Sequence, residues 1–530
     1  MHTRIFFIFV VLLFANPQLI RGQNENISRS SDFDGEPYIA CNPQNTNNIV
    51  IAWMGYTYGK NISIKTECSF DGGKTWGNEN TLPHLSTGFT SADVSMAYHN
   101  GGIVYITYID YSESPAKGGI YITHSTDGGK LWSNPVKVWD VLETTKEAID
   151  RPWLVVDNTG GKNDGTLYIT TKPAPWIPAP NRPYLKYSSD SGKTWSDWQY
   201  LDSTGYLVGN TIQAPMAAPS VTADGAFMAI YPSYLSSQSP YPQAFYTKTY
   251  DKGKTFTRGV VASKLTGTTD TIYKLGQRFF ADPKNKDNVT SAWVDSRNGD
   301  PDVYSSSSSD SGKTWGREIR VNDDSVSNGV AQDLVWGVYD TSGNIVLTWR
   351  DRRNASGTGD MQPYDIYASV SKNNGNTFSK NIRITDTTNP FNSILEKKGN
   401  DFMSSYLLND TIYSSWGDVR TGYLNIFFAR TAITGTTTNI VIAKEKTQSM
   451  TVYPSPAKNQ INISYTSEEN MQVVIYVTDL QGKNILKPVS HRMLAGNQVI
   501  SLGISILAAG NYICTVKCEE GNQSARFEVE

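Results

Sequence analysis

The sequence predicts an all-β protein in which a β-propeller is followed by a small C-terminal β-sandwich. Runs of Val, Ile, Thr, Tyr and Trp are broken by clusters of Gly, Asn, Asp and Pro, as in short strands joined by turns. A motif of Ser, Asp, Gly, Thr and an aromatic residue recurs about every sixty residues. After Ala432 the composition changes at a Thr-rich hinge, which separates two domains.

The first residues have the pattern of a secretory signal peptide. Arg4 precedes a short apolar run at 5–14 (IFFIFVVLLF), and a polar stretch ends near Gly22. Such a run is too short to be a permanent membrane anchor, and no later run is long enough to span a bilayer. We therefore expect residues 1–22 to be removed and the mature protein, without a transmembrane segment, to be secreted or held on the outer cell surface.

Charge and cysteine content exclude some classes of function. The formal net charge of −3 offers no basic field for nucleic acid or anionic membrane. The spacing of the four cysteines fits neither a disulfide nor a metal site, so we expect unpaired core thiols. No cofactor signature is present, although loop carboxylates and carbonyls can bind calcium without a readable motif.

The recurring motif predicts a hairpin in each repeat. The Asp carboxylate can accept backbone N–H bonds across a tight turn, and the Gly supplies the positive φ that the turn needs. Each unit has four strands, which is typical of a propeller blade. Full copies stand at 69–76 (SFDGGKTW), 188–195 and 308–315 (both SSDSGKTW), a copy at 125–132 has Leu131 for Thr, and weaker copies stand at 249–256 and 371–378.

The motifs suggest six blades, but another feature favours seven. One residue holds the same place in the second strand of each unit: Trp53, Tyr108, Thr170, Tyr231, Trp293, Trp349 and Trp416. The last of these units lacks a fourth strand. Residues 25–28 (ENIS) resemble the fourth strands at 318–322 and 381–385, so we expect the N-terminal segment to close the ring and remove its exposed edges.

The motifs resemble the Asp-box, or BNR, repeats of the sialidase superfamily over nearly all of residues 31–385. This resemblance implies a propeller at 23–433 whose ligand face lies opposite the motifs. That face is formed by the loops between second and third strands and by the starts of the innermost strands. The Arg-Ile-Pro motif common near the start of sialidase domains is replaced here by Glu36-Pro37-Tyr38.

The C-terminal residues 450–530 follow an expected linker at 434–449. They contain VYPSPA at 452–457, VTDLQGK at 477–483 and LAAGNY at 507–512. In this order the three motifs resemble the type A sorting domain of the type IX secretion system. The resemblance implies a β-sandwich, export across the outer membrane of a Bacteroidetes-type bacterium, and the secretion machinery as a partner.

Three arginines on the expected ligand face follow an Asp by two residues. Arg297, Arg353 and Arg420 each end a second strand in this way. Their guanidiniums could bind a carboxylate or a sulfated sugar bidentately. Alternatively, each Asp–Arg pair fastens its own hairpin.

Less repetitive residues stand at the starts of the innermost strands. We assign candidate catalytic roles to Asp150 and Asp401 and candidate substrate-binding roles to Arg151 and Arg278, because acids and arginines there could supply proton transfer and anion binding. Ion pairs that merely line the channel are the alternative. Weaker carboxylate candidates at equivalent positions are Glu36 and Asp93.

Two long loops, 172–184 and 232–245, are rich in proline and aromatic residues. Trp176, Tyr234 and Tyr241 could present flat apolar faces to sugar rings, or pack on neighbouring blades.

Together these features predict a secreted propeller acting on glycans, which we expect to be an exo-glycosidase on acidic sugars. A non-catalytic glycan- or protein-binding adhesion propeller is the alternative, and elimination chemistry through His99 or His124 is a less favoured one.

Overall fold

The structure is a computed structural model that describes residues 24–56, 59–266, 277–393, 399–433, 450–467, 471–480, 483–494, 496–518 and 521–530. The expected signal peptide and linker lie outside these ranges. The chain divides into two units, Met1–Asn439 and Ile440–Glu530, which we describe separately. The described residues contain no helix, and hence no helix long and apolar enough to cross a membrane.

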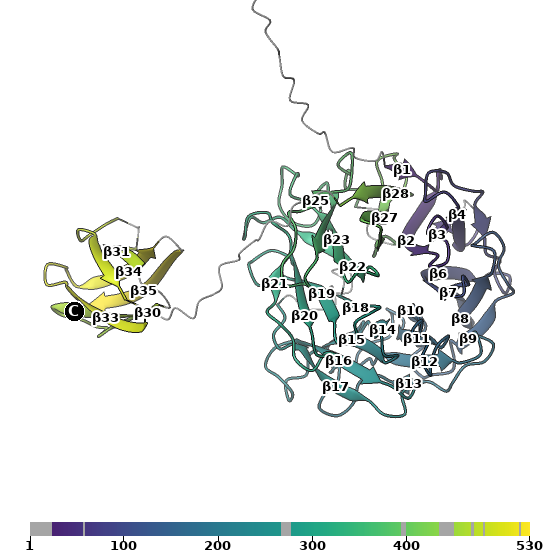
Figure 1. The fold of residues 1–530 in the computed structure, drawn as a ribbon, viewed down its shortest axis with the longest axis horizontal. Coiled ribbons are helices and arrows are strands. Elements are labelled where there is room, and N and C mark those ends of the chain that lie inside the picture. The colour runs from purple at the N-terminus through teal and green to yellow at the C-terminus, as the bar shows by residue number, and fades with distance from the viewer. Residues whose placement is uncertain are drawn as a thin grey trace, which may run out of the picture. The chain divides into compact units, whose positions relative to one another are not determined.

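Within its described part, unit 1 contains seven four-stranded antiparallel sheets arranged around a centre (Figure 1). Sheets one to three consist of β2 (Phe33–Cys41), β3 (Ile49–Tyr56), β4 (Ser63–Ser69) and β5 (Asn80–Thr81); β6 (Thr90–Tyr98), β7 (Val104–Glu113), β8 (Ala116–Ser125) and β9 (Val136–Asp140); and β10 (Asp150–Val156), β11 (Leu167–Lys172), β12 (Tyr184–Ser188) and β13 (Gln199–Tyr200). Sheets four to six consist of β14 (Ala218–Val221), β15 (Phe227–Ser233), β16 (Gln243–Thr249) and β17 (Thr257–Ala262); β18 (Gln277–Ala281), β19 (Val289–Asp295), β20 (Asp302–Ser308) and β21 (Ile319–Arg320); and β22 (Gln332–Tyr339), β23 (Ile345–Asp351), β24 (Asp365–Ser371) and β25 (Ile382–Arg383). Sheet seven consists of β26 (Ser404–Leu408), β27 (Thr411–Asp418), β28 (Asn425–Ala432) and β1 (Glu25–Asn26).

The first short strand completes sheet seven, as the sequence predicts. The strand order in this sheet is β1-β28-β27-β26, with Glu25 opposite Phe428. The Ile27 N–H donates to the carbonyl of Ile426 at 2.7 Å, and the Ile27 side chain is fully buried. The N-terminal segment therefore covers the edge of β28, so that the described residues form seven sheets rather than six.

The second strands carry the predicted buried position. Its seven residues are at most 2% exposed, and the six aromatic ones lie in apolar clusters that join neighbouring sheets. The seventh, Thr170, instead donates its hydroxyl to the carbonyl of Ala217, directly before β14 of the next sheet. One cluster, for example, combines Val50 and Ala52 of β3 with Val94 of β6 and Ile106 of β7. Burial of these side chains between sheets, rather than in a separate core for each sheet, holds the ring together.

The motifs form the predicted hairpins between third and fourth strands. At 308–315 the Ser308 hydroxyl donates to Asp310 Oδ1 at 2.7 Å and accepts the N–H of Gly312, whose φ is 85°. The Thr314 N–H donates to the same carboxylate oxygen at 2.9 Å. The motif therefore satisfies its own polar groups, which explains why it recurs as a structural element.

Four innermost strands contain a bulge that turns a side chain. The bulged residue has a positive φ in each case: Glu36 (56°) in β2, Asp93 (53°) in β6, Arg151 (55°) in β10 and Leu334 (52°) in β22. Residues other than glycine rarely adopt such angles, and bulges re-aim side chains. Three of the four redirected side chains are charged, and all three of these line one cavity.

Unit 2 is the predicted small β-sandwich. One sheet contains β29 (Met450–Tyr453), β30 (Gln460–Ser467) and β33 (Gly496–Gly503), and the other contains β32 (Val489–Met493), β31 (Met471–Thr478), β34 (Gly510–Cys518) and β35 (Gly521–Val529). Ile463 of the first sheet and Ile475 and Val516 of the second share one apolar cluster, so the two sheets face each other.

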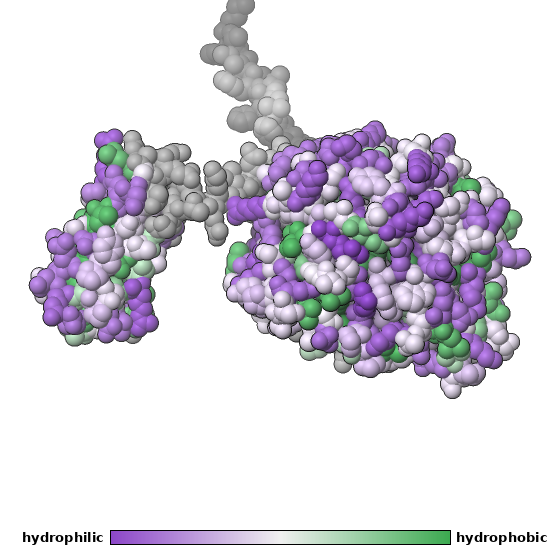
Figure 2. All heavy atoms as spheres, turned by 90° about the horizontal axis from the view of Figure 1, so that it is seen from below, coloured by the Kyte–Doolittle hydropathy of each residue, from purple (hydrophilic) through white to green (hydrophobic). Residues whose placement is uncertain are grey.

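The described cysteine side chains carry thiols without disulfides. Cys41, Cys68 and Cys514 are buried, as expected of core residues, whereas the side chain of Cys518 lies outside the described part. On the face drawn in Figure 2, polar residues cover most of the surface of unit 1 and apolar residues are scattered among them. That face offers no single large apolar patch.

Candidate functional site

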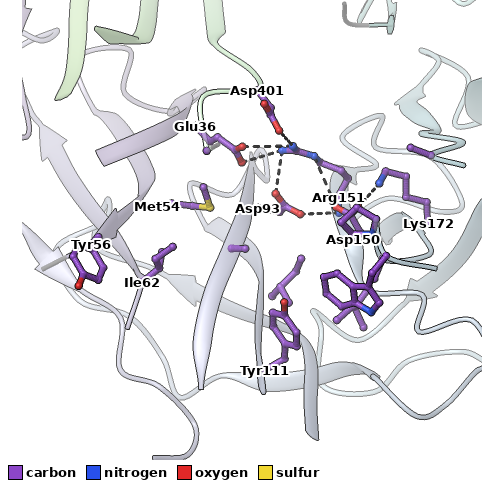
Figure 3. Close-up of a pocket in the computed structure, with 18 of the residues that line it drawn as sticks. Glu36, Met54, Tyr56, Ile62, Asp93, Tyr111, Asp150, Arg151, Lys172 and Asp401 are labelled. Atoms are coloured by element: carbon purple, nitrogen blue, oxygen red, sulfur yellow. Dashed lines mark hydrogen bonds and ion pairs between the residues drawn. The ribbon is translucent and has the colours of Figure 1, made fainter. Parts of the chain in front are cut away.

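A cavity of about 520 Å³ opens where sheets one, two and three meet, at the strand ends opposite the box hairpins (Figure 3). The expected ligand face is thus the face that holds the cavity. Its charged lining residues are Glu36, Asp93, Asp150, Arg151, Lys172 and Asp401; its larger apolar and aromatic ones are Phe33, Met54, Tyr56, Ile62, Ile109, Tyr111, Ile149 and Trp176.

Arg151 lies among three carboxylates at the inner end of the cavity. Its Nη1 donates to Glu36 Oε2 at 2.9 Å and is 3.0 Å from Asp93 Oδ1. Its Nη2 donates to Asp401 Oδ2 at 2.8 Å. The Arg151 N–H also donates to Asp93 Oδ2, so the bulge that turns Arg151 is itself fixed by a carboxylate.

Asp150 faces the same cavity and is held by a different cation. Its carboxylate pairs with the buried ammonium of Lys172, and it forms a side-chain hydrogen bond with Asp93 (Figure 3). The chain of contacts runs from Lys172 through Asp150 and Asp93 to Arg151. Four carboxyl groups therefore share two cations, which leaves the site rich in negative charge.

Burial of this excess charge shifts the proton affinities. Burial raises the pKa of Asp150 to about 6, with Lys172 opposing the shift and Asp93 adding to it. Burial also raises the pKa of Glu36 and Asp93, against the opposing effect of Arg151. Burial alone would lower the pKa of Arg151, but the surrounding carboxylates raise it well above its usual value. The cavity thus holds a permanent cation beside carboxyl groups that keep protons to unusually high pH.

The centre of the ring beneath the cavity is filled by aromatic side chains. Trp153, Trp336 and Phe402 pack edge-on or stacked against one another. The guanidinium of Arg278 lies 4.3 Å from the ring centre of Trp153 and 3.8 Å from that of Trp336. Arg278 therefore packs in the channel and is not among the residues that line the larger cavity, and its burial lowers its pKa to about 9.

Of the three candidate aromatic platforms, Trp176 lines the cavity. Its ring stacks on Tyr111 with ring centres 5.9 Å apart, and its Nε1–H donates to Glu147 at 2.9 Å. Trp176 is 45% exposed, which suits a contact surface at the mouth. Tyr234 and Tyr241 are also partly exposed but do not belong to the cavity lining.

The three repeated arginines contact carboxylates of their own surroundings. Arg297 is paired with Asp295 and Glu318, Arg353 with Asp351 and Asp323, and Arg420 with Asp418 and Asp386. The Asp partner two residues earlier is fully buried in each case. Each arginine therefore stabilises its own hairpin by ion pairs, and none of the three lines the cavity.

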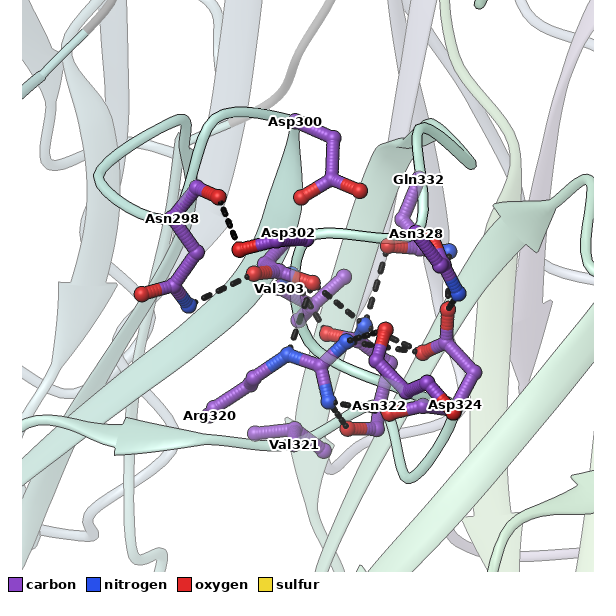
Figure 4. Close-up of polar contacts among 12 residues, drawn as sticks. Asn298, Asp300, Asp302, Val303, Arg320, Val321, Asn322, Asp324, Asn328 and Gln332 are labelled. Carbon is purple, nitrogen blue, oxygen red and sulfur yellow. Dashed lines mark hydrogen bonds and ion pairs between the residues drawn. The ribbon is translucent and has the colours of Figure 1, made fainter. Parts of the chain in front are cut away.

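A polar network elsewhere on unit 1 likewise joins side chains of the protein to one another (Figure 4). Asp302 accepts hydrogen bonds from Arg320 and Asn322 at 2.7 Å each, and Asp324 accepts from Asn322 and Asn328 at the same distance. The network joins sheet five to the segment before β22. Within the described ranges no group of three or more His, Cys, Asp or Glu residues could hold a metal ion.

The structure thus brings four of the candidate site residues, Asp150, Arg151, Asp401 and Trp176, into one cavity. The sequence analysis treated Glu36 and Asp93 as weaker candidates, although both line the cavity and contact Arg151. It did not name Lys172 or Tyr111, which also line the cavity. Lys172 opens the proline-rich loop that the sequence singled out, which was the available signal. For Tyr111 the sequence contains no signal, because its role follows from stacking on Trp176.

Comparisons with known proteins agree with the sequence motifs. Residues 111–339 match the model of the BNR repeat-like domain, and residues 451–530 match that of the secretion system C-terminal sorting domain. No curated protein matches the chain.

Several solved structures resemble it at low identity. A protein of unknown function from Dyadobacter fermentans is 17% identical, with 67% of this chain and 98% of that chain covered and a TM-score of 0.42. The NanB sialidase from Streptococcus pneumoniae is 12% identical (78% and 71% covered, TM-score 0.37), and an alpha-L-arabinanase from Penicillium chrysogenum is also 12% identical (77% and 98% covered, TM-score 0.43). At these values the comparisons say nothing about activity. The chain thus contains a BNR repeat-like domain within its ring of seven sheets and a secretion system C-terminal sorting domain, and the latter indicates export to the cell surface or beyond.

Proposed function

We propose that the propeller is a glycoside hydrolase whose active site is the cavity around Arg151. The observation that carries this proposal is the carboxyl group of Asp150, which lines the cavity with a pKa raised to about 6. Such a group is protonated over part of the neutral range and can protonate a leaving glycosidic oxygen.

Glycoside hydrolysis needs a second carboxylate beside the acid. Asp401 suits this role, because it lines the same cavity and Arg151 Nη2 donates a hydrogen bond to its Oδ2 at 2.8 Å. Trp176 at the mouth supplies an apolar face for a sugar ring. Arg151 positions the carboxylates and is not itself available for a substrate anion.

The charges in the cavity favour a sugar without an acidic group. Arg297, Arg353 and Arg420, on which the expectation of acidic sugars rested, are occupied by carboxylates outside the cavity. Inside it, four carboxyl groups meet Arg151 and Lys172. A substrate carboxylate would add a like charge to a buried, acid-rich site, which costs free energy.

The test is a glycosidase screen of the full chain with nitrophenyl glycosides and glycan mixtures. Asp150→Asn should lower kcat/KM by about 10²- to 10⁴-fold on poor leaving groups, and by much less on dinitrophenyl glycosides, which need no acid. Asp190→Asn, in a box hairpin on the opposite face, is the matched control and should leave the rate unchanged. Equal losses on both classes of leaving group would contradict the assigned role.

A second candidate is a glycan-binding propeller without turnover. It is favoured by one observation, namely that Arg151 and Lys172 between them contact all four cavity carboxyl groups. In that case calorimetry should detect glycan binding that Trp176→Ala weakens by roughly 1 kcal/mol or more, with no product released. Product formation by the wild-type chain would exclude this alternative.

A further inference from the structure

A serine, a histidine and an aspartate form a hydrogen-bonded chain between sheets one and two. Ser63 begins β4, His84 lies in the segment between β5 and β6, and Asp110 belongs to β7. His84 Nε2 is 3.0 Å from Ser63 Oγ, and His84 Nδ1 is 2.7 Å from Asp110 Oδ1. A hydroxyl, an imidazole and a carboxylate in this order are the groups that activate a serine nucleophile.

The surroundings of Asp110 fix the direction of these hydrogen bonds. The Asp110 side chain is fully buried and accepts the N–H of Leu85 at 2.8 Å and the Ser91 hydroxyl at 2.9 Å. A carboxylate can only accept hydrogen bonds, so the proton of the neutral imidazole lies on Nδ1. The lone pair of His84 Nε2 therefore faces the Ser63 hydroxyl, as a general base must.

The serine and the histidine can be reached from solvent. Both residues are half-buried, and 23% of the His84 side chain is exposed. Ile62 and Ile109, which directly precede Ser63 and Asp110, line the cavity described above. The three residues thus stand beside that cavity, on the same face of the ring.

We propose that Ser63, His84 and Asp110 form a second catalytic centre, which hydrolyses small carboxylic esters such as an acyl group on a sugar hydroxyl. Ser63 Oγ bonds to the acyl carbon while its proton passes to His84 Nε2. The ester C–O bond then breaks, and the leaving alcohol takes that proton. Water attacks the acyl-serine, passes a proton through His84 back to Ser63 Oγ, and releases the carboxylic acid. Asp110 positions His84 and stabilises its charged form.

The esterase activity itself does not depend on the glycosidase proposal; only the choice of a sugar ester rests on it. The test uses the full chain, a fluorophosphonate probe and p-nitrophenyl acetate. Peptide mass spectrometry should find the phosphonyl adduct on Ser63. Ser63→Ala, which removes one oxygen atom and little packing, should abolish labelling and reduce ester hydrolysis to background.

The chain offers a matched control in a second serine–histidine contact. Ser133 Oγ is 3.0 Å from His124 Nδ1, and no carboxylate contacts His124 within the described residues. Ser133→Ala should therefore leave labelling and turnover unchanged. An adduct on another serine, an adduct that persists in Ser63→Ala, or a folded wild-type chain that neither labels nor turns over would overturn the proposal.

Variants of the other two residues separate catalysis from structure. His84→Gln should lower the rate by about 10²- to 10⁴-fold. Asp110→Asn should also lower the rate, because an amide nitrogen can donate to Nδ1 and so move the ring proton to Nε2. Asp110→Glu, which keeps a carboxylate acceptor, should recover part of this loss. Equal rates for Asp110→Asn and Asp110→Glu in folded chains would contradict the role of Asp110.

Failure of this proposal is distinguishable from failure of the glycosidase. Asp150→Asn should leave hydrolysis of p-nitrophenyl acetate unchanged, and Ser63→Ala should leave glycosidase activity on unacylated substrates unchanged. An acetylated sugar then tests the assigned substrate class. Turnover of the nitrophenyl ester without turnover of the sugar ester would refute the sugar as the alcohol and retain the esterase.

Discussion

Arg151 is a buried cation whose charge three acids share, and its removal leaves those acids uncompensated. Arg151→Met should therefore lower the free energy of unfolding at pH 7 by about 3–5 kcal/mol. The deficit should shrink as pH falls, because Glu36 and Asp93, whose pKa is raised by burial, take up protons and no longer need the cation. Urea denaturation at pH 7 and pH 4 measures this difference.

Lys137 provides the comparison for Arg151. Its side chain is 45% exposed and pairs with Asp140, whose side chain is 43% exposed. Lys137→Met should cost only about 0–1 kcal/mol, because solvent screens the pair. If the two variants lost the same stability at both pH values, the buried cluster around Arg151 would not have the electrostatic role that its contacts indicate.

Asp150 makes the stability of the protein depend on pH in a defined direction. Its pKa is raised from 3.8 to about 6 in the folded state, so the native protein holds this proton more tightly than the unfolded chain. The wild type therefore loses stability as pH rises between about 4 and about 6. Asp150→Asn removes this loss, so the stability of the variant relative to wild type should increase across that window and stay constant above it.

Asp333 provides the control, because its pKa is shifted in the opposite direction. Burial acts to raise its pKa, but Arg350 and Arg352 more than offset this and lower it to about 2. Its carboxylate stabilises the fold above pH 4, and this contribution is lost as pH falls through 2. Asp333→Asn should therefore lose stability relative to wild type as pH rises from 2 to 4. Guanidinium denaturation curves from pH 2 to 8 would record both trends, and parallel curves for the two variants would contradict the shifts.

At the scale of elements, the box hairpins tolerate substitution because the turn needs only an acceptor at one position. Asn373 takes the place of the Asp in the box at 371–378, and its Oδ1 accepts the Thr377 N–H at 2.9 Å. The Asp310 carboxylate makes the same bond and also accepts the Thr314 hydroxyl, which lowers its pKa to about 2. The amide thus preserves the hairpin without the charge-assisted bonds.

Asn373→Asp should stabilise the sixth sheet by supplying a charged acceptor. The expected gain is about 0.5–1 kcal/mol at pH 7, since charge-assisted hydrogen bonds are stronger than neutral ones and this site is exposed. The gain is fully present above the unfolded pKa of the new carboxyl group and should be lost as pH falls through its lowered folded pKa. Thermal unfolding at pH 7 and pH 2 checks this, and an undiminished gain at pH 2 would contradict it.

The bulges in the innermost strands could not be predicted from the sequence, and the reason is physical. Glu36, Asp93 and Arg151 precede residues of ordinary strand pattern, and no glycine marks their positive φ. Their conformation is imposed by contacts between sheets, such as the Arg151 N–H bond to Asp93. The starts of the innermost strands could be predicted as the site, but the sharing of one cation by three acids could not.

Over the whole molecule, features that recur in each repeat could be predicted from the sequence, whereas contacts between residues of different repeats could not. The hairpin motif, the buried second-strand position and the extra strand at 25–28 all recur in sequence and were predicted. Ser63, His84 and Asp110 belong to different strands and loops of two sheets, with no motif joining them. The pairing of Arg297, Arg353 and Arg420 with acids was foreseen as an alternative, because an Asp precedes each by two residues.

Closure of the ring by β1 gives the last prediction. Ile27, directly after β1, is fully buried in a cluster with Ile51 and Trp53 of sheet one and Phe428 of sheet seven. Ile27→Asp would place an unpaired charge there and release the segment, leaving the backbone groups along β28 without partners. We expect a lower Tm and concentration-dependent association through this edge, measured by thermal unfolding and by light scattering after size exclusion.

Ile230→Ala, an equally buried site within β15, should cost about 2–5 kcal/mol without association. A monomeric Ile27→Asp at all concentrations would show that the N-terminal strand does not protect the edge.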